Sequence, residues 1–325
     1  MMKFLEGRGE TVSRVLLALA VYAAFAIVQP GFGRVSNLNT ILDGFAFAGL
    51  AALGIGITII AGELDLSIGS MAAVAGVIAV QFAELGLILA TLVAVVVGTI
   101  FGVLQGIVIV RLKINSLVFT IGTLIALRGL AFILSGEQTI VVPDLAIADA
   151  IRQQLGIFSP FSLVTIVMFV LVGSFMAYHR WGREIYAIGG GREEAQAAGI
   201  SLYRPMAIAF GIAGGAAALA GALVSIKSGS ASPNGFENLL LPAATAALIG
   251  GTSLTGGKGS AFRIAIGAVT IRFIVSGLSL RGAPFYVESL ALGVLLILVI
   301  VFELGFETPQ AKERLRRRRL ARAPA

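Results

Sequence analysis

The sequence predicts an all-α polytopic membrane protein built as a bundle of transmembrane helices. Of its 325 residues, 58% are hydrophobic and only 13% are charged, whereas about a quarter of the residues in soluble domains carry charge. The mean hydropathy is +0.98. A transmembrane helix needs about 20 apolar residues, and apolar stretches of that order fill most of the chain. Only short connections remain, which leaves no room for a separate soluble domain.

Apolar stretches and the polar residues that interrupt them predict about ten transmembrane helices. Two of the expected spans, 67–83 and 239–251, are near or below the length needed to cross the hydrocarbon core. These two are therefore the candidates for broken or re-entrant helices. The full set of expected spans is 12–28, 40–61, 67–83, 87–110, 117–134, 161–178, 205–225, 239–251, 260–280 and 285–302.

The basic residues predict the orientation of the bundle. If the spans alternate from a cytoplasmic N-terminus, most Lys and Arg residues fall in cytoplasmic stretches, as the positive-inside rule requires. With ten spans, both termini are then cytoplasmic. The expected organisation is an N-terminal segment 1–11, a single transmembrane domain 12–302 and a basic tail 303–325. Within the transmembrane domain, we expect loop 135–160 outside and loop 179–204 in the cytoplasm.

Several other classes of protein are excluded by composition. The chain has no Cys and only one His, His179, which rules out disulfides, thiolate metal sites and a multi-histidine metal cluster. The basic tail has no interleaved aromatic residues, so we expect it to face the anionic inner leaflet of the membrane rather than nucleic acid. The first span contains Ala24-Phe25-Ala26, which resembles a signal-peptide cleavage site. Because the apolar run continues to Val28, we expect this span to be retained.

Two acidic residues lie between apolar spans in residues 62–70, Gly-Glu-Leu-Asp-Leu-Ser-Ile-Gly-Ser. Asp65 and Ser67 are placed where an N-cap would begin a helix near Ile68. The same segment can form a polar break beside a translocation path, where helix N-termini and backbone groups bind hydroxyls. The two interpretations are compatible, since a broken helix needs caps.

A second polar segment, residues 250–260, reads Gly-Gly-Thr-Ser-Leu-Thr-Gly-Gly-Lys-Gly-Ser. It matches a phosphate-binding loop only in part. In one register Gly257 stands where the lysine belongs, and in the other Gly259 replaces the Ser or Thr that would bind magnesium. We therefore expect a tight turn between two membrane helices and no nucleotide site.

Residues 189–191 are three consecutive glycines that precede a run of helix-forming residues. Glu193 and Glu194 lie in the first turn of that run, which favours a helix, and Gly199 supplies a stop. The segment predicts a short helix parallel to the membrane on the cytoplasmic side, with a solvated amphipathic loop as the alternative.

Charged residues inside predicted spans are few, and they include Arg128 and Arg272, with Asp43 and Glu288 near the outer ends of their spans. A charge at membrane depth usually faces protein or water and has a partner. We expect Arg128 and Arg272 to be structural charges, with partners that the sequence does not identify. The lack of an intramembrane carboxylate or histidine relay argues against a proton-coupled carrier.

These motifs together resemble the permease subunits of ribose/xylose-type bacterial ABC sugar importers. Residues 62–70 are similar to that family's Gly-Gly-Ile-Asp-Leu-Ser-x-Gly-Ser, with Glu63 in place of a glycine. Residues 249–260 match its Ile-Gly-Gly-Thr-Ser-Leu-x-Gly-Gly-x-Gly-Ser throughout, and 182–190 match its Gly-Arg-x-Ile-Tyr-Ala-Ile-Gly-Gly. The chain departs from the family at 241–244, where Leu-Pro-Ala-Ala replaces an Asp-Ala-Ile-Ala-like stretch. The cargo therefore stays open among pentose, hexose, polyol, nucleoside and sugar-like signalling molecule.

The resemblance implies one subunit of an ATP-driven importer in the bacterial cytoplasmic (inner) membrane. Its partners would be a second permease copy, identical or related, a cytoplasmic ATPase that binds ATP and Mg²⁺, and an external sugar-binding protein. This chain would bind no cofactor and catalyse no reaction itself. The coupling helix toward the ATPase would comprise Arg192, Glu193, Glu194, Ala195, Ala198 and Gly199. Our hypotheses for the translocation path are Asp65, Ser67, Thr252 and Ser253.

Two alternatives belong to other classes. An ion-coupled secondary carrier would work as a single chain with internal repeats, and Gly69-Ser70 and Gly259-Ser260, which each open a span, permit a weak repeat. A membrane-embedded enzyme would need convergent polar groups. His179, at a membrane end beside Arg180, fits an interfacial position better than a catalytic one.

Overall fold

The computed structural model describes the backbone of residues 2–307 and the side chains of residues 9–301. The basic tail predicted for 303–325 lies outside the described residues from 308 onward. The described chain is mainly helical, as predicted. One exception is a pair of two-residue strands, β1 (Ile140–Val141) and β2 (Ser230–Ala231), which run antiparallel with Ile140 opposite Ala231.

Seven of the described helices are long and apolar enough to cross a membrane. Three further apolar helices, α3, α11 and α13, complete the set, so each of the ten predicted spans coincides with a helix. That all ten helices cross the membrane stays a prediction. The seven are α1 (Met2–Val28), α2 (Val35–Ile60), α4 (Leu87–Leu112), α5 (Ser116–Ser135), α7 (Pro160–Tyr178), α10 (Tyr203–Ser228) and α12 (Ala261–Leu280); the three are α3 (Ile68–Gln81), α11 (Leu240–Ile249) and α13 (Phe285–Glu307).

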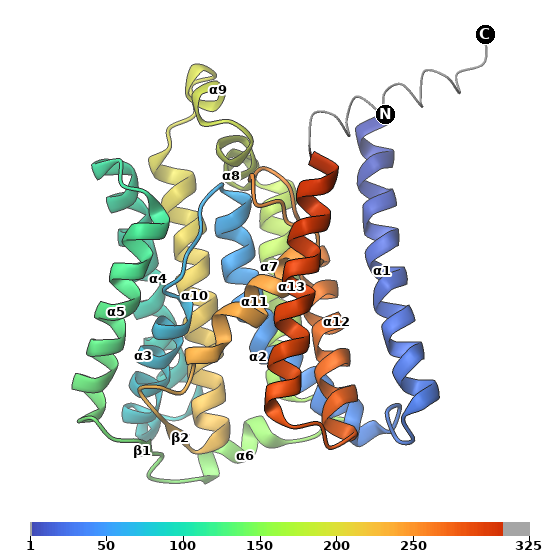
Figure 1. The fold of residues 1–325 in the computed structure, drawn as a ribbon. Helices are drawn as coiled ribbons and strands as arrows, with labels where there is room; N and C mark the ends of the chain where they lie inside the picture. The colour runs from blue at the N-terminus through green and yellow to red at the C-terminus, as the bar shows by residue number, and fades with distance from the viewer. Residues whose placement is uncertain (1, 308–325) are drawn as a thin grey trace.

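Short elements gather at the two ends of the bundle (Figure 1). Helices α8 (Arg180–Gly190) and α9 (Arg192–Ala197) lie at one end, which we call the α9 end, together with the start of α1 and the last described turn of α13. Helix α6 (Ala146–Arg152) and the strand pair lie at the opposite, α6 end. The first and last described helices thus begin and end on the same side. Two 3-10 turns, η1 (Ala83–Leu85) and η2 (Glu237–Leu239), precede α4 and α11.

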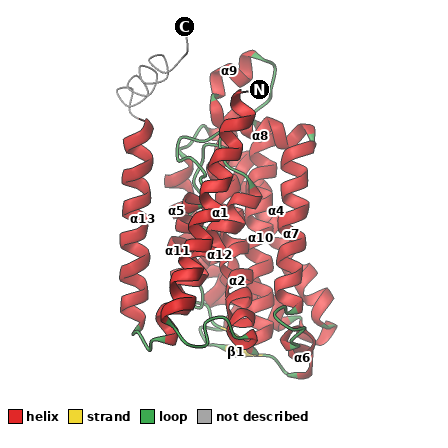
Figure 2. Cartoon of the chain, turned by 90° about the vertical axis from the view of Figure 1, so that its right-hand side faces the viewer, coloured by secondary structure: helices red, strands yellow, loops and turns green. Residues whose placement is uncertain are grey.

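Helix α10 is the centre of the bundle, packed against α2, α3 and α4. Its contact with α4 is made by small residues: a Cβ on Gly102 would overlap the carbonyl oxygen of Phe210, and Cβ atoms on Gly98 and Gly106 would also lie within 3 Å of α10 carbonyl oxygens. The glycines of α4 therefore allow close packing against α10. Helix α1 packs on α12, and α13 stands apart at the periphery against α11 and α12 (Figure 2).

Two helices are too short to cross the membrane alone. Helix α3 has 14 residues and α11 has 10, so at about 1.5 Å per residue they measure roughly 21 and 15 Å, against about 30 Å of hydrocarbon. They coincide with the two spans that the sequence singles out as short. Non-helical polar segments, 61–67 and 250–260, adjoin them.

Helix α2 begins five residues before the predicted span, at Val35 instead of 40. The polar residues at its start are satisfied within the protein. Asn37 donates to the carbonyl of Phe32 at 2.8 Å and accepts from the Ser276 hydroxyl at 2.9 Å. Polar residues that interrupt an apolar stretch therefore do not mark the end of a helix when their side chains have hydrogen-bond partners.

Candidate functional site

Segment 61–67 carries a buried carboxylate between α2 and α3. Asp65 is only 3% exposed. Its Oδ1 accepts from the Ser67 backbone N–H at 2.9 Å, from the Ser67 hydroxyl at 2.6 Å and from Gln105 Nε2 at 3.2 Å. Ser67 occupies the N-cap position of α3, but its side chain caps no helix amide. The predicted cap is thus corrected: the Ser67 backbone is in the right-handed helical region (φ −78°, ψ −7°) instead of the extended conformation of an N-cap, and its hydroxyl donates to the Asp65 carboxylate.

Gln105 in α4 also belongs to this cluster, and the sequence did not identify it. Its side chain is buried, and its Oε1 has no hydrogen-bond partner among the described residues. The available signal was a single amide inside the predicted span 87–110.

The second polar segment, 250–260, connects α11 to α12 without regular structure, as predicted. Thr252 and Ser253 are both buried. The Ser253 hydroxyl lies 2.9 Å from that of Thr255, and Ser260 caps α12 by accepting from the Arg263 N–H at 3.3 Å. The four residues predicted for the path are therefore buried in two connecting segments, 61–67 and 250–260.

Three chain segments meet backbone to backbone at the α9 end, in a contact that we call the glycine junction: 60–62, 189–190 and 256–257. The Gly257 N–H donates to the carbonyl of Ile60 at 2.8 Å. A Cβ on Gly189 would overlap that same carbonyl oxygen and would lie 2.7 Å from the Gly257 nitrogen. Glycine is required at 189 because any side chain would separate α8 from both loops.

Side chains reinforce the junction. Arg192, the first residue of α9, forms an ion pair with Glu63, whose side chain is 8% exposed against 47% for the arginine. The Tyr186 hydroxyl in α8 donates to the carbonyl of Gly259 at 3.1 Å. Burial raises the pKa of the Tyr186 phenol, against an opposing effect of Arg263, so the phenol stays protonated and can donate. Helices α8 and α9 are thereby tied to both polar segments.

Helix α9 projects from the bundle (Figure 1). Glu193 and Glu194 lie in its first turn, and Gly199 follows it with φ +82°, while the Ile200 N–H donates to the carbonyl of Ala195 at 2.9 Å. This is the helix stop that the sequence predicts. Arg192, Glu193, Glu194, Ala198 and Gly199 are exposed and Ala195 is buried. The three-glycine break is shorter than expected, because Gly189 and Gly190 belong to α8 and only Gly191 interrupts.

The two arginines that the sequence predicts at membrane depth have different surroundings. Arg128 pairs with Glu237, with 3.4 Å between Nη1 and Oε1. The guanidinium of Arg272 packs directly over Gly44, and its Nε has no hydrogen-bond partner among the described residues. The sequence could not assign the Arg128 partner, because Glu237 precedes the predicted span 239–251 and therefore counts as a loop residue.

Another charged pair near the α6 end joins α2 to α10. Lys227 Nζ lies 2.5 Å from Asp43 Oδ2, and the Ser159 hydroxyl donates to the same carboxylate. Both charged side chains are about three-quarters buried. This pair holds α2, α7 and α10 together at that end.

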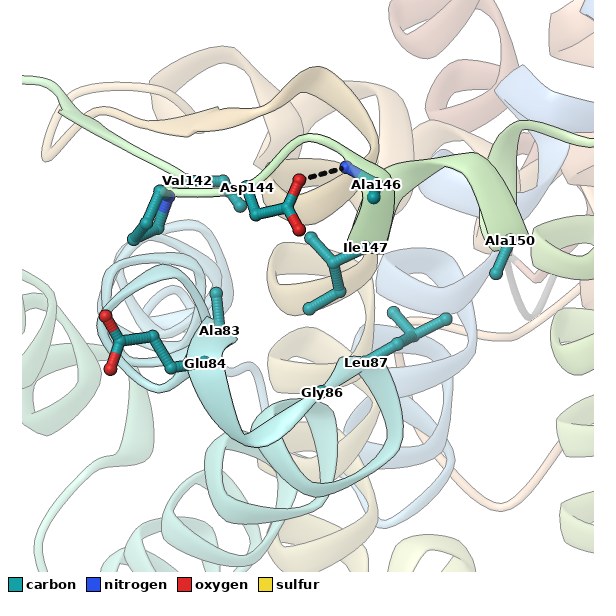
Figure 3. A pocket seen from close by; sticks show the side chains of 10 residues that line it. Ala83, Glu84, Gly86, Leu87, Val142, Asp144, Ala146, Ile147 and Ala150 are labelled. Atoms are coloured by element: carbon teal, nitrogen blue, oxygen red, sulfur yellow. Dashed lines mark hydrogen bonds between the residues drawn. The ribbon is translucent and has the colours of Figure 1, made fainter.

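A cavity of about 420 Å³ opens at the α6 end (Figure 3). Its wall is mainly apolar, with Leu87 and Ile147, and it carries the acids Glu84 and Asp144. Asp144 Oδ1 accepts from the Ala146 N–H at 2.9 Å, which fixes the start of α6. The cavity is formed by the predicted external loop and the turn before α4.

Comparison with known proteins identifies the family. Residues 37–300 match the family model described as branched-chain amino acid transport system / permease component. The chain belongs to this family of permeases. Similar proteins include the ribose import permease of Haemophilus influenzae, 29% identical over 92% of this chain and 94% of its own, and the autoinducer 2 import permease of Salmonella paratyphi A, 31% identical over 88% and 89%. An L-arabinose ABC transporter permease of Azospirillum brasilense is 28% identical over 89% and 86%. No solved structure matches the chain.

These relatives confirm the resemblance to sugar ABC importer permeases that the motifs indicate. The permease is a multi-pass membrane protein of a transport family.

Proposed function

We propose that the permease is the membrane subunit of an ATP-driven ABC importer for a sugar or sugar-like solute in the bacterial cytoplasmic membrane. The observation that carries the proposal is the glycine junction, with its Glu63–Arg192 and Tyr186–Gly259 links. It ties an exposed, projecting helix, α9, to the two polar segments that break the membrane helices. A membrane subunit that is driven by a separate ATPase needs such a link between its ATPase-contacting helix and its membrane segments.

The proposed partner at the α9 end is a cytoplasmic ATPase, which binds ATP and Mg²⁺ itself. Helix α9, with Arg192, Glu193, Glu194, Ala195, Ala198 and Gly199, enters a groove of the ATPase as a coupling helix. When nucleotide closes the ATPase, α9 and α8 move together. The junction passes that movement to segments 61–67 and 250–260, which shifts the bundle between two packings.

The orientation follows from the same proposal. The α9 end, where the described part of the chain begins and ends, is cytoplasmic, and Arg180, Arg183, Arg192 and Arg204 there satisfy the positive-inside rule. The α6 end, with the acid-bearing cavity of Figure 3, faces the external binding protein. A second permease copy completes the membrane part of the importer. Relatives are named for ribose, arabinose and autoinducer 2, which supports a small hydroxylated solute.

Asp65, Ser67, Thr252 and Ser253 are proposed as residues of the translocation path. All four are buried in this structure, so the proposal requires that the two polar segments separate during the cycle. Asp65→Ala and Ser253→Ala should each lower solute uptake at normal membrane abundance. Unchanged uptake in both variants would remove these residues from the path.

Affinity purification from native membranes tests the importer assignment. The tagged permease, extracted in mild detergent, should co-purify with an ATPase that carries nucleotide-binding domains, identified by mass spectrometry. A neighbouring binding protein can then be screened for its solute. A chain that purifies alone and moves solute into liposomes without ATP would contradict the proposal.

A further inference from the structure

One face of the bundle carries charged groups at membrane depth. Arg128 is in α5, which has 20 residues from Ser116 to Ser135. At about 1.5 Å per residue it lies roughly 18 Å from the first residue of the helix and roughly 10 Å from the last. Its partner Glu237 is in η2, immediately before α11. Figure 1 shows α11 at mid-height of the bundle, between α5 and α13. Neither charge is near an end of the molecule.

This ion pair is open to its surroundings. The side chains of Arg128 and Glu237 are 38% and 46% exposed, and they share a single contact of 3.4 Å. Asn234 and Asn238 flank Glu237 and are also exposed. Beside Arg128, Gly129 is exposed, and a Cβ built on it would meet no atom within 4 Å. We call Arg128, Asn234, Glu237 and Asn238 the polar face.

Such a face cannot border lipid. A charged side chain at the bilayer centre is costly unless it is paired and hydrogen-bonded. The single 3.4 Å contact satisfies only one donor of Arg128 and one acceptor of Glu237. Other helices show what a lipid-facing surface of this protein looks like. The exposed large side chains of α4 between Leu89 and Leu104 are all apolar, as are those of α7 between Leu163 and Leu171. The polar face therefore faces water or a partner protein instead of lipid.

We propose that the polar face is the solute-contacting wall of the translocation path. The chemistry fits a solute rich in hydroxyl groups, because a hydroxyl both donates and accepts. Arg128 offers donors only, the Glu237 carboxylate offers acceptors, and the two asparagine amides offer both. The single contact between Arg128 and Glu237 can open and give each group to a solute hydroxyl. This inference rests on the proposed importer function and adds residues that the buried path hypothesis does not include.

The face differs from the buried path residues in one useful respect. Asp65 already accepts three hydrogen bonds within the protein, so a solute could reach it only by replacing them. The polar face is available without any rearrangement of segments 61–67 and 250–260. The second permease copy then closes the path from the opposite side.

Cysteine accessibility tests the proposal directly, because the chain contains no native cysteine. Single variants Gly129→Cys and Asn238→Cys place a thiol on the polar face, and Gly129 has space for it. Ile100→Cys in α4 and Val170→Cys in α7 are the controls; these residues are 55% and 60% exposed on apolar surfaces. Membrane vesicles are treated with 2-(trimethylammonium)ethyl methanethiosulfonate, which does not cross membranes, and modification is followed by mass spectrometry.

The expected result is that both polar-face thiols react at least about tenfold faster than the controls, because only a hydrated thiol ionises to the reactive thiolate. Reaction rates equal to those of the controls would overturn the inference, since the face would then border lipid or a dry protein interface.

A second experiment tests whether the water at the polar face belongs to the translocation path. In vesicles that contain the whole assembly, trapping with ATP and vanadate should change the rate at Asn238→Cys about fivefold or more, because alternating access opens or closes the path. If the Asn238→Cys thiol reacts at the same rate with and without ATP and vanadate, the face is a surface that does not change during the transport cycle, and the inference is overturned. Failure of the ATPase to co-purify is a separate result that overturns the importer assignment instead.

Discussion

An Arg–Glu pair lies beside the glycine junction and another lies in the polar face, but the two pairs are built differently. The Glu63 side chain is 8% exposed, and its partner Arg192 is the first residue of α9. The preceding helix, α8, packs backbone to backbone against segments 60–62 and 256–257. Glu237 is 46% exposed and shares one 3.4 Å contact with Arg128. A packed junction transmits movement, since interiors have few alternative arrangements. An open pair can exchange partners, which suits contact with a solute.

The largest expected effect comes from filling the junction. Gly189→Ala should lower the free energy of unfolding by about 3 kcal/mol, because the new Cβ overlaps the carbonyl of Ile60 and overpacks the contact. Thermal unfolding in detergent measures the change. Gly190→Ala is the matched control, since a Cβ there meets no atom within 4 Å. Equal unfolding temperatures for the two variants would mean that the junction is not tightly packed.

Removing one partner of the junction ion pair should have the next largest effect. Arg192→Gln leaves the Glu63 carboxylate buried and unpaired, which should cost about 2 kcal/mol after allowance for the half-exposed arginine. Glu63→Gly removes the charge together with its need for a partner and should cost less. A double variant no more stable than Arg192→Gln alone would contradict a direct pair.

Much of the junction could be predicted from the sequence, but its assembly could not. Residues 62–70, 182–190 and 249–260 stand out by composition, and the stop at Gly199 follows from local rules. Their meeting depends on close backbone approach across long chain separations, which no local pattern encodes. Glu63, read as a departure from a family glycine, proves to have Arg192 as its partner.

The polar face was harder to predict, for a different reason. Arg128 is conspicuous inside an apolar span, but Glu237 lies outside the predicted span 239–251 and was therefore counted as a loop residue. Its depth depends on η2 and α11 starting within the bundle instead of at its end. Helix boundaries in the apolar stretches, by contrast, followed hydropathy to within two residues in most cases, as in α4 and α7.

A smaller effect on stability is expected at the polar face. Arg128→Gln should change the free energy of unfolding by less than about 1 kcal/mol, because exposed ion pairs contribute little. Solute uptake should nevertheless fall, since the variant loses donors at the path. Unfolding in detergent and uptake in whole cells are measured on the same variant. A loss of stability as large as that of Arg192→Gln would make the pair structural.

The smallest effect on stability is expected at α9 itself. Glu194 is exposed, so Glu194→Lys should leave the unfolding temperature unchanged while lowering transport and uncoupling the ATPase from solute. Glu194→Gln, which removes the charge without reversing it, is the control. Normal transport by Glu194→Lys would remove α9 from the coupling mechanism.

The most direct test combines a reporter in the polar face with substitutions at the glycine junction. Asn238→Cys reports the state of the polar face, and it can be combined with Gly189→Ala, with Arg192→Gln or with the control Gly190→Ala. In membranes that contain the ATPase, we predict that ATP and vanadate change the thiol reaction rate in the Gly190→Ala background but not in the two junction variants. An unchanged response in Gly189→Ala and Arg192→Gln, with the ATPase still bound, would contradict the claim that the glycine junction couples the ATPase to the translocation path.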